Sequence, residues 1–283
     1  MPEVLRAALL VLATTLLPAV HAQEQVEFDS LDVADGKPVR LLGHWFVAPA
    51  PKASAPALVL LHGCGGPYAR SGQLDERMRS YAALLNAQGT HALVLDSLTP
   101  RGEKELCTQK VGTRRVTQAN RRLDALAALA WLSRRTGVNP LRIGLLGWSN
   151  GGSTVLAAVN ARHPAVAAAS AKAAFAVAFY PGCEAELKRG FESRTPLLML
   201  VGEADDWTPA APCHELASVA AGPMKPAIEG YAGAYHGFDS RAPLRLRKDV
   251  PNGVKPGQGV HVGGDTAARE ASRQRLLQFL AQY

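Results

Sequence analysis

The chain has 283 residues, of which 47% are hydrophobic and 19% are charged. This composition fits one large globular domain and argues against long disordered, charged tails. The formal net charge is +7, but the basic residues are scattered and aromatic residues make up only 6%. Because no nucleic-acid-binding motif accompanies this charge, we expect no nucleic-acid partner.

The first residues have the pattern of a secretory signal peptide. Arg6 precedes an apolar stretch over residues 7–17, and small residues lead up to Ala22. An uncleaved membrane anchor is the alternative, but the apolar stretch is shorter than the roughly 20 residues that a bilayer span needs. We predict that residues 1–22 are removed and that residues 23–283 form a single domain. The mature protein would then be secreted or periplasmic, without stable membrane insertion.

The rest of the chain alternates between strand and helix patterns. In chain order these patterns predict strand 26–31, strand 39–47, strand 57–61, helix 74–88, strand 90–95, helix 116–135, strand 141–146, helix 153–162, strand 173–179, strand 196–201, helix 212–221, strand 225–231, loop 241–264 and helix 265–283. The short apolar strands are typical of a sheet that is buried on both faces. The alternation predicts an α/β fold, with helices on both faces of a mostly parallel central sheet of about eight strands.

A serine stands between two glycines where a predicted strand must turn into a helix, in Gly147-Trp148-Ser149-Asn150-Gly151. The glycines let the strand and the helix pack closely around a sharp turn, which presents the serine hydroxyl at the carboxyl edge of the sheet. The N-terminus of the following helix favours negative charge at the same place. The alternative is an ordinary Gly/Ser turn, but this context predicts that Ser149 is a nucleophile.

A nucleophilic serine needs a base and an acid that orients the base. In chains with such a turn the acid and then the histidine follow the serine. Asp205 comes just after a predicted strand, and His236 lies in a Gly-rich loop beyond the last strand. Asp206 and Glu203 remain alternatives to Asp205. Three further histidines lack a comparable position: His163, His214 and His261.

An oxyanion hole is predicted where an earlier strand ends, in the segment His62-Gly63-Cys64-Gly65-Gly66. Glycine-rich loops of this kind supply backbone N–H groups to the oxyanion in esterases. We expect the N–H groups of Cys64 and Asn150 to be the donors and His62 to brace the loop. Cys64 is not at a strand-to-helix turn, which argues against a nucleophilic thiol there.

Five segments together resemble the dienelactone hydrolase family of α/β-hydrolases: LLHGCGG, LVLDSLTPRG, GWSNGG, GEADDWTP and YHGF. The resemblance extends from about Val39 to the last predicted helix. It implies an α/β-hydrolase fold. The aspartate of the family comes three residues after a glycine and four before a proline, which matches Gly202, Asp205 and Pro209. The family's histidine lies in an HGF-like segment and corresponds to His236.

The sequence also departs from this family. Dienelactone hydrolases proper use a cysteine where this chain has Ser149, they are typically cytosolic, and segment 241–264 is additional. General ester hydrolysis is therefore more plausible than dienelactone turnover. Four residues are candidates for lining the substrate pocket: Arg101, Trp148, Tyr180 and Trp207. An ion pair at the surface would explain Arg101 equally well, and plain packing would explain the three aromatic residues equally well.

The chain has four cysteines, which allow three disulfide pairings. Cys183 and Cys213 follow consecutive predicted strands at the active edge, and so do Cys64 and Cys107. We therefore predict the disulfides Cys183–Cys213 and Cys64–Cys107, which an oxidising compartment would allow.

These observations predict a serine hydrolase that acts on small-molecule carboxylic esters through an acyl-enzyme, with no metal and no organic cofactor. Two other functions remain open. One is a peptidase on the same fold, which would use the same three residues. The other is a non-catalytic binding protein that retains the scaffold.

Overall fold

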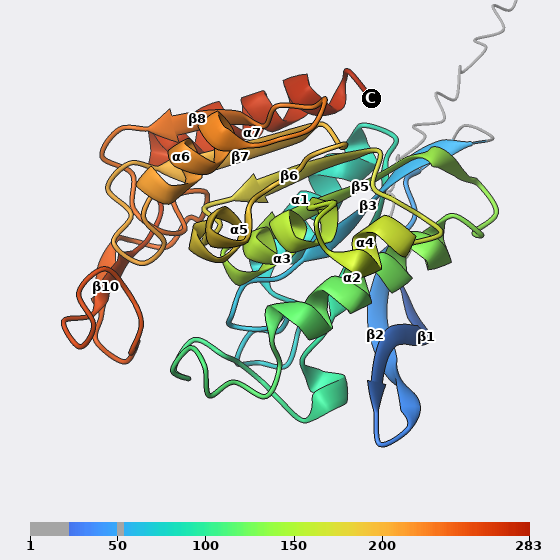
Figure 1. Ribbon diagram of the computed structural model, residues 1–283, viewed down its shortest axis with the longest axis horizontal. Coiled ribbons are helices and arrows are strands. Elements are labelled where there is room, and N and C mark those ends of the chain that lie inside the picture. Colours follow the sequence, from blue (N-terminus) through green and yellow to red (C-terminus); the bar gives the residue numbers. More distant parts are fainter. Residues whose placement is uncertain (1–22, 50–53) are drawn as a thin grey trace, which may run out of the picture.

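The computed structural model describes residues 23–49 and 54–283, and the predicted signal peptide lies outside these residues. Within them, an eight-stranded sheet has the order β1-β2-β4-β3-β5-β6-β7-β8 (Figure 1). Its strands are β1 (Gln23–Ala34), β2 (Lys37–Phe46), β3 (Ala55–Leu61), β4 (His91–Asp96), β5 (Val138–Trp148), β6 (Phe175–Phe179), β7 (Leu197–Gly202) and β8 (Ala227–Tyr231). The strands from β4 to β8 pair in parallel, whereas β1–β2 and β2–β4 are antiparallel. The predicted α/β-hydrolase fold is confirmed.

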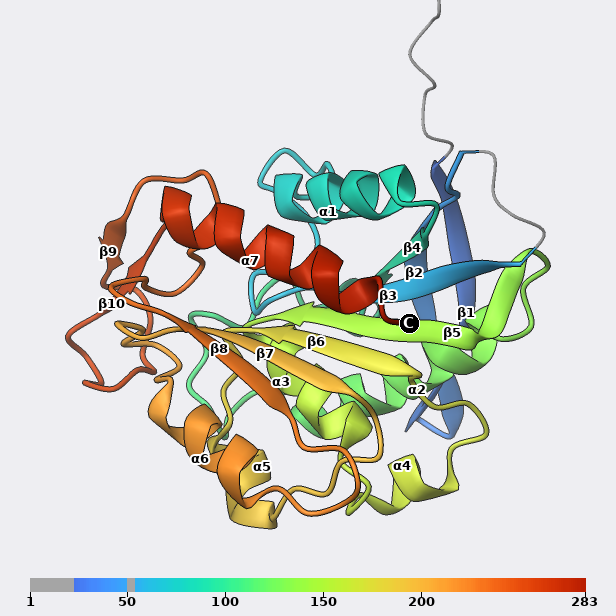
Figure 2. The same cartoon turned by 90° about the horizontal axis from the view of Figure 1, so that it is seen from above.

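Helices cover both faces of the sheet, as Figure 2 shows. The helices are α1 (Glu76–Ala87), α2 (Gln118–Leu132), α3 (Asn150–Val159), α4 (Pro164–Ala168), α5 (Glu184–Arg189), α6 (Ala211–Val219) and α7 (Thr266–Leu280), with a 3₁₀ turn over Thr99–Arg101. Helices α1 and α7 lie on one face, and the other five lie on the opposite face. The side chain of Asp265 caps α7 by accepting the N–H of Ala268 at 2.8 Å.

The core forms two layers because successive side chains of a strand point to opposite faces of the sheet. In β3, Val59 and Leu61 pack with α2 and α3, whereas Leu58 and Leu60 pack toward α1 and α7. Every residue of β4, β6 and β7 is buried. Burial on both faces explains why β6 and β7 are continuous apolar runs in the sequence and why β4 is apolar over residues 92–95, between His91 and Asp96.

The strand register aligns the carboxyl ends of the central strands. Leu61 at the end of β3 is paired with Gly147 of β5, and Trp148 of β5 is paired with Phe179 of β6. The loops that follow β3, β5, β6, β7 and β8 therefore emerge at one edge, which we call the carboxyl edge. The opposite edge, where these strands begin, is the amino edge.

The predicted loop 241–264 is not wholly irregular. It contains a two-stranded antiparallel sheet of β9 (Arg245–Arg247) and β10 (Val260–Val262), which projects at one end of the molecule in Figure 1. His236 also forms a β-bridge with Val262. Helices α4 and α5 were not predicted, and the helix predicted over 153–162 begins earlier, at Asn150.

Both predicted disulfides are present, Cys64–Cys107 and Cys183–Cys213. The first joins the loop after β3 to the segment between β4 and α2, and the second joins the start of α5 to α6. Both lie at the carboxyl edge. Among the described residues, no helix is both long and apolar enough to cross a membrane.

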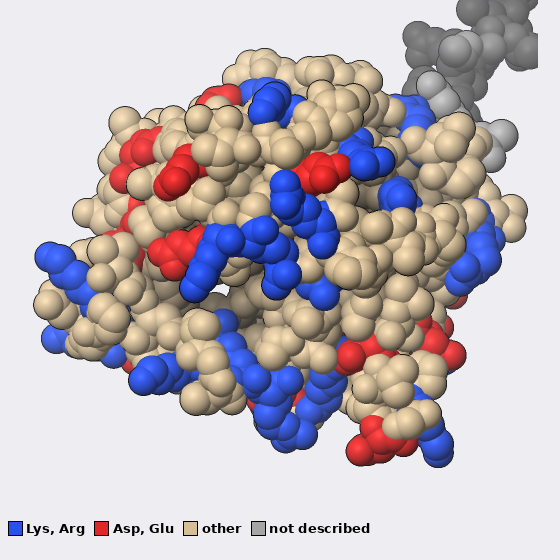
Figure 3. All heavy atoms as spheres, viewed as in Figure 1, with Lys and Arg blue, Asp and Glu red and all other residues tan. Residues whose placement is uncertain are grey.

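Figure 3 shows one face of the molecule, on which Lys and Arg gather around a hollow and some Asp and Glu lie beside them. Arg121 of α2 differs from these surface residues because it is fully buried, with 0% of the residue exposed.

Candidate active site

Ser149 lies in the tight turn between β5 and α3, with a φ of 54° and a ψ of −117°. Few non-glycine residues adopt a positive φ, and such strain persists only where the surrounding structure holds it. The flanking glycines permit the turn. A Cβ at Gly147 would overlap the carbonyl of Gly151, and a Cβ at Gly151 would overlap the carbonyl of Leu61. The spacing of glycines around Ser149 is therefore a steric requirement.

The structure brings His236 and Asp205 together with this serine. The Nε2 atom of His236 is 2.9 Å from the Oγ of Ser149, and its Nδ1 atom is 2.8 Å from an Oδ2 of Asp205. With the proton on Nδ1, the ring donates to the carboxylate and accepts from the hydroxyl. All three residues are at least nine-tenths buried. This arrangement is the one that a serine needs to become a nucleophile.

The competing carboxylates are engaged elsewhere. Asp206 is 2.7 Å from the ring of His261 and also accepts its backbone N–H, whereas Glu203 is 2.9 Å from the ring of His214. Asp205 is the carboxylate in contact with His236. The third alternative histidine, His163, is buried against Glu186 at 3.0 Å.

Thr208 is part of the same cluster, and the sequence analysis did not identify it. Its Oγ1 is 3.1 Å from both Nδ1 of His236 and Oδ2 of Asp205, and 3.0 Å from the carbonyl oxygen of Tyr180. Asp205 also accepts the backbone N–H groups of Trp207 and Thr208. Segment DDWTP therefore forms a turn that is held by hydrogen bonds to the carboxylate of Asp205. This turn places the hydroxyl of Thr208 beside His236.

The predicted oxyanion loop lies directly against Ser149. A Cβ at Gly63 would be 3.7 Å from the Cβ of Ser149. The carbonyl of Cys64 accepts the N–H of Leu106 at 2.7 Å, so a hydrogen bond and a disulfide both join this loop to the segment between β4 and α2.

His62 holds the shape of this loop. Its Nδ1 is 2.7 Å from the carbonyl oxygen of Gly63, and its Nε2 faces the N–H of Ser97 at 3.5 Å. Burial, together with the guanidinium of Arg121, holds the pKa of His62 well below its usual value. The ring is therefore neutral at pH 7.

Two of the four candidate pocket residues contact His236. The rings of Tyr180 and Trp207 each lie 4.7 Å from its imidazole ring, measured between centroids. Tyr180 has a positive φ of 36°, and its hydroxyl donates to the buried Asp239 at 2.7 Å. Burial raises the pKa of this hydroxyl well above its usual value, so it stays protonated. The guanidinium of Arg247 lies over the ring of Trp207.

The other two candidates have structural partners elsewhere. Trp148 is only 1% exposed and packs in the core against the rings of Tyr81 and Phe179. Arg101 donates to Asp124 at 2.8 and 2.9 Å and to Asp32 at 2.7 Å. The structure therefore supports the alternative roles: Trp148 packs in the core, and Arg101 forms ion pairs.

Residues 46–283 match the sequence model of the dienelactone hydrolase family. The chain belongs to the dienelactone hydrolase family. The match includes every residue of the Ser149, His236 and Asp205 cluster and the loop after β3. It begins within β2 and therefore leaves out β1 and most of β2.

Solved structures of this family and of related esterases share the fold. A dienelactone hydrolase-like promiscuous phosphotriesterase from metagenomic libraries is 17% identical, with a TM-score of 0.62 over 92% of this chain and 98% of the other. The dienelactone hydrolase of Anabaena variabilis is 18% identical, with a TM-score of 0.60 over 92% and 98%. A thermophilic esterase of Thermogutta terrifontis is 17% identical, with a TM-score of 0.59 over 94% and 96%. At these identities the likeness establishes the fold.

Proposed function

We propose that this member of the dienelactone hydrolase family is a serine hydrolase that cleaves carboxylic esters. The observation that carries the proposal is the continuous contact from Asp205 through His236 to Ser149, on a strained turn beside a glycine-rich loop. Membership in a family of hydrolases supports the same class of reaction.

In the proposed acylation step, Ser149 attacks the ester carbonyl while Nε2 of His236 takes the proton of its hydroxyl. The resulting imidazolium is stabilised by Asp205, which also fixes the orientation of the ring. When the tetrahedral intermediate collapses, the C–O bond to the alcohol breaks and His236 gives the proton to the departing oxygen. The acyl group then remains on Ser149.

Deacylation uses the same groups. His236 removes a proton from water, the hydroxide attacks the acyl-enzyme carbonyl, and the proton returns to Ser149 as the acid leaves. In both steps the negative charge develops on the former carbonyl oxygen. We propose that the backbone N–H groups of Cys64 and Asn150 receive this oxygen, helped by the N-terminus of α3.

The substrate is proposed to bind against the ring of Trp207 beside His236. Trp207 is partly exposed, so an apolar part of a small ester would find contacts there, whereas Tyr180 is only 2% exposed and supports the ring of His236 by packing. A serine in place of the cysteine of dienelactone hydrolases proper favours general ester hydrolysis over dienelactone turnover.

We further propose that the protein is exported and acts as a single domain over residues 23–283. The disulfides Cys64–Cys107 and Cys183–Cys213 support export because such bonds persist in oxidising compartments. N-terminal sequencing of the secreted or periplasmic protein tests this, and a mature chain that begins at Gln23 is expected. Recovery of the full-length chain from the cytoplasm, with four free thiols, would contradict it.

Hydrolysis of p-nitrophenyl acetate and butyrate by the purified protein tests the catalytic assignment. Ser149→Ala is expected to abolish hydrolysis, since it removes the only group proposed to form the acyl-enzyme. Ser272→Ala is the matched control, because Ser272 is also buried but lies on α7 and donates to the carbonyl of Arg269. Wild-type rates in Ser149→Ala would refute the proposal.

A further inference from the structure

Arg121 connects the two segments proposed to form the oxyanion hole. One end of its guanidinium, Nη2, donates to the carbonyl of His62 at 2.8 Å, and the other, Nη1, donates to the side-chain oxygen of Asn150. His62 opens the loop after β3, and Asn150 is the residue after the nucleophile. These segments are far apart in the sequence, and the side chain of one α2 residue joins them.

This guanidinium is buried without a carboxylate in contact. None of the ion pairs found among residues 23–49 and 54–283 includes Arg121, and its two acceptors are neutral oxygens. The nearby Asp124 is held by Arg101 and Ser30. The Nε atom of Arg121 has no hydrogen-bond partner in the described part of the chain.

Burial lowers the pKa of Arg121 to about 10, with Asp124 and Asp96 acting in the opposite direction, so the side chain stays charged at neutral pH. Burying a charge without a paired carboxylate is costly, and an apolar side chain of similar volume would fill the same space at lower cost. An energetic cost of this kind indicates that the buried charge of Arg121 has a function at this position.

Asn150 is held from more than one side. Its backbone carbonyl accepts from the side chain of Gln118 at 3.0 Å and from the hydroxyl of Thr154 at 2.9 Å, while Arg121 holds its side chain. Helix α2 therefore supplies two residues, Gln118 and Arg121, that fix the first residue of α3. Its backbone N–H is the group that must point at the developing oxyanion.

We propose that Arg121 is the positioning residue of the oxyanion hole. It fixes the loop after β3 relative to the start of α3, and it places a permanent positive charge behind the point where the tetrahedral intermediate becomes negative. The inference rests on the proposed esterase function. Since both effects act on charge that exists only in the transition state, loss of Arg121 should lower kcat and leave KM nearly unchanged.

Arg121→Met tests this role because methionine retains much of the volume but neither the charge nor the donors. We expect kcat for p-nitrophenyl butyrate to fall by about 10–100-fold, with KM within about threefold of wild type. Arg122→Met is the matched control. Arg122 is the next residue of α2, only partly buried, and its charge interacts with Glu186 and Arg189. Its kcat should stay within about twofold of wild type.

A pair of inhibitors separates positioning of the oxyanion hole from a general structural role. Ser149 would convert an alkyl trifluoromethyl ketone into a tetrahedral oxyanion, whereas the matching methyl ketone binds mainly as a neutral carbonyl. In Arg121→Met the affinity for the trifluoromethyl ketone should fall by the same factor as kcat/KM, and that for the methyl ketone should be unchanged. Equal losses for both inhibitors, or a kcat at the wild-type level, would overturn the proposal.

Two further variants carry the test if Arg121→Met does not fold. Arg121→Lys keeps the charge but cannot span both acceptors, and Asn150→Ala removes one acceptor while keeping the backbone N–H. Each folded variant should lose about 3–10-fold in kcat and in trifluoromethyl ketone affinity. Wild-type values in both variants would overturn the proposal.

Failure of this inference can be told apart from failure of the proposed function. If Ser149→Ala abolishes hydrolysis while Arg121→Met retains it, only the role of Arg121 is refuted. If the wild-type protein hydrolyses no ester, or Ser149→Ala remains active, the esterase proposal fails and the role of Arg121 fails with it.

Discussion

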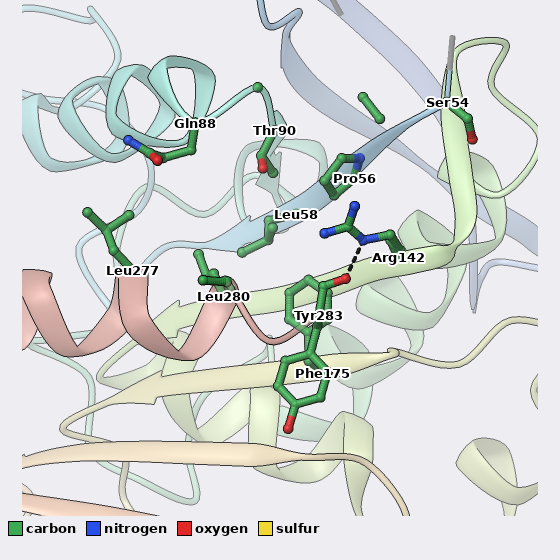
Figure 4. A pocket seen from close by; sticks show the side chains of 13 residues that line it. Ser54, Pro56, Leu58, Gln88, Thr90, Arg142, Phe175, Leu277, Leu280 and Tyr283 are labelled. Atoms are coloured by element: carbon green, nitrogen blue, oxygen red, sulfur yellow. Dashed lines mark hydrogen bonds between the residues drawn. The ribbon is translucent and has the colours of Figure 1, made fainter. Parts of the chain in front are cut away.

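The two edges of the central sheet hold different features. At the amino edge, a cavity of about 330 Å³ lies between the start of β3 and the end of α7 (Figure 4). Its lining includes Leu58, Phe175 and Leu280, and the side chain of Arg142 donates to the carbonyl of Tyr283. At the carboxyl edge, Ser149, His236 and Asp205 are nearly buried and in contact with one another.

This difference shows that the volume of a cavity does not by itself indicate where reactive side chains lie. The amino-edge cavity is lined by apolar side chains together with polar ones such as Gln88, Thr90 and Arg142, and its lining in the described part of the chain includes no histidine, aspartate or glutamate. The carboxyl edge instead holds Ser149 and Tyr180 at positive φ, and each such residue costs about 1–3 kcal/mol of strain. Strain and buried polar groups accumulate where a protein must orient side chains for reaction. Substitutions at the carboxyl edge should therefore affect activity more than substitutions at the amino edge.

The largest expected effect comes from the acid at the carboxyl edge. Asp205→Asn should lower kcat by about 10³–10⁴-fold, because an amide cannot stabilise the imidazolium and favours the wrong tautomer of His236. The adjacent Asp206→Asn is the matched control and should stay within about threefold, since Asp206 bonds His261 instead. The measurement is ester hydrolysis by both purified variants. Equal losses in the two would contradict the assignment of Asp205.

The two disulfides both lie at the carboxyl edge, but their removal should have different effects on catalysis. Replacing either pair of cysteines by serine should lower the free energy of unfolding by about 2–4 kcal/mol, as measured by chemical denaturation. Only loss of Cys64–Cys107 should also slow ester hydrolysis, because this bond fastens the proposed oxyanion loop. A Cys183/Cys213 variant with the larger catalytic loss would be the contrary result.

Thr208 should have a smaller effect on catalysis. Thr208→Val keeps the shape of the side chain but removes the hydroxyl that touches His236 and Asp205, and we expect kcat to fall by about tenfold. Thr208→Ser retains the hydroxyl and should recover most of the activity. Both rates come from the same ester assay, and a serine variant as slow as the valine variant would show that packing of the methyl group matters instead.

The smallest effect on activity is expected at the amino edge. Leu280→Ala enlarges the cavity there and should lower the free energy of unfolding by about 1–3 kcal/mol. Its kcat and KM should stay at wild-type values, since the change lies across the sheet from Ser149. A selective loss of hydrolysis in a stably folded Leu280→Ala protein would show that the two edges are not functionally distinct.

Much of the fold could be predicted because its signals are local. Run 57–61 is apolar throughout and run 90–95 is apolar from residue 92 onward, and both form strands buried on both faces. The glycines around Ser149 indicate a turn for a steric reason that can be stated from the sequence. Strands β9 and β10 have three residues each, which is too few to show a strand pattern in the sequence, so they were not predicted within loop 241–264.

The neighbours of the site could not be predicted because they depend on contacts between distant segments. Arg121 is 59 residues from His62 and lies on an arginine-rich helix, where the sequence indicates only a solvated face. Trp148 stands next to Ser149, yet its side chain points into the core because successive strand residues alternate between faces. Whether a residue at the end of a strand lines a pocket or packs in the core therefore depends on the face of the sheet to which its side chain points.

The most direct test of the account is to locate the adduct of a fluorophosphonate probe by peptide mass spectrometry. The wild-type protein should carry one adduct, on Ser149, and His236→Gln should label far more slowly. His214→Gln, which changes an exposed histidine paired with Glu203, should label at the wild-type rate. An adduct on a different residue, or an active esterase whose Ser149 stays unmodified, would contradict the claim that the carboxyl edge performs acyl transfer.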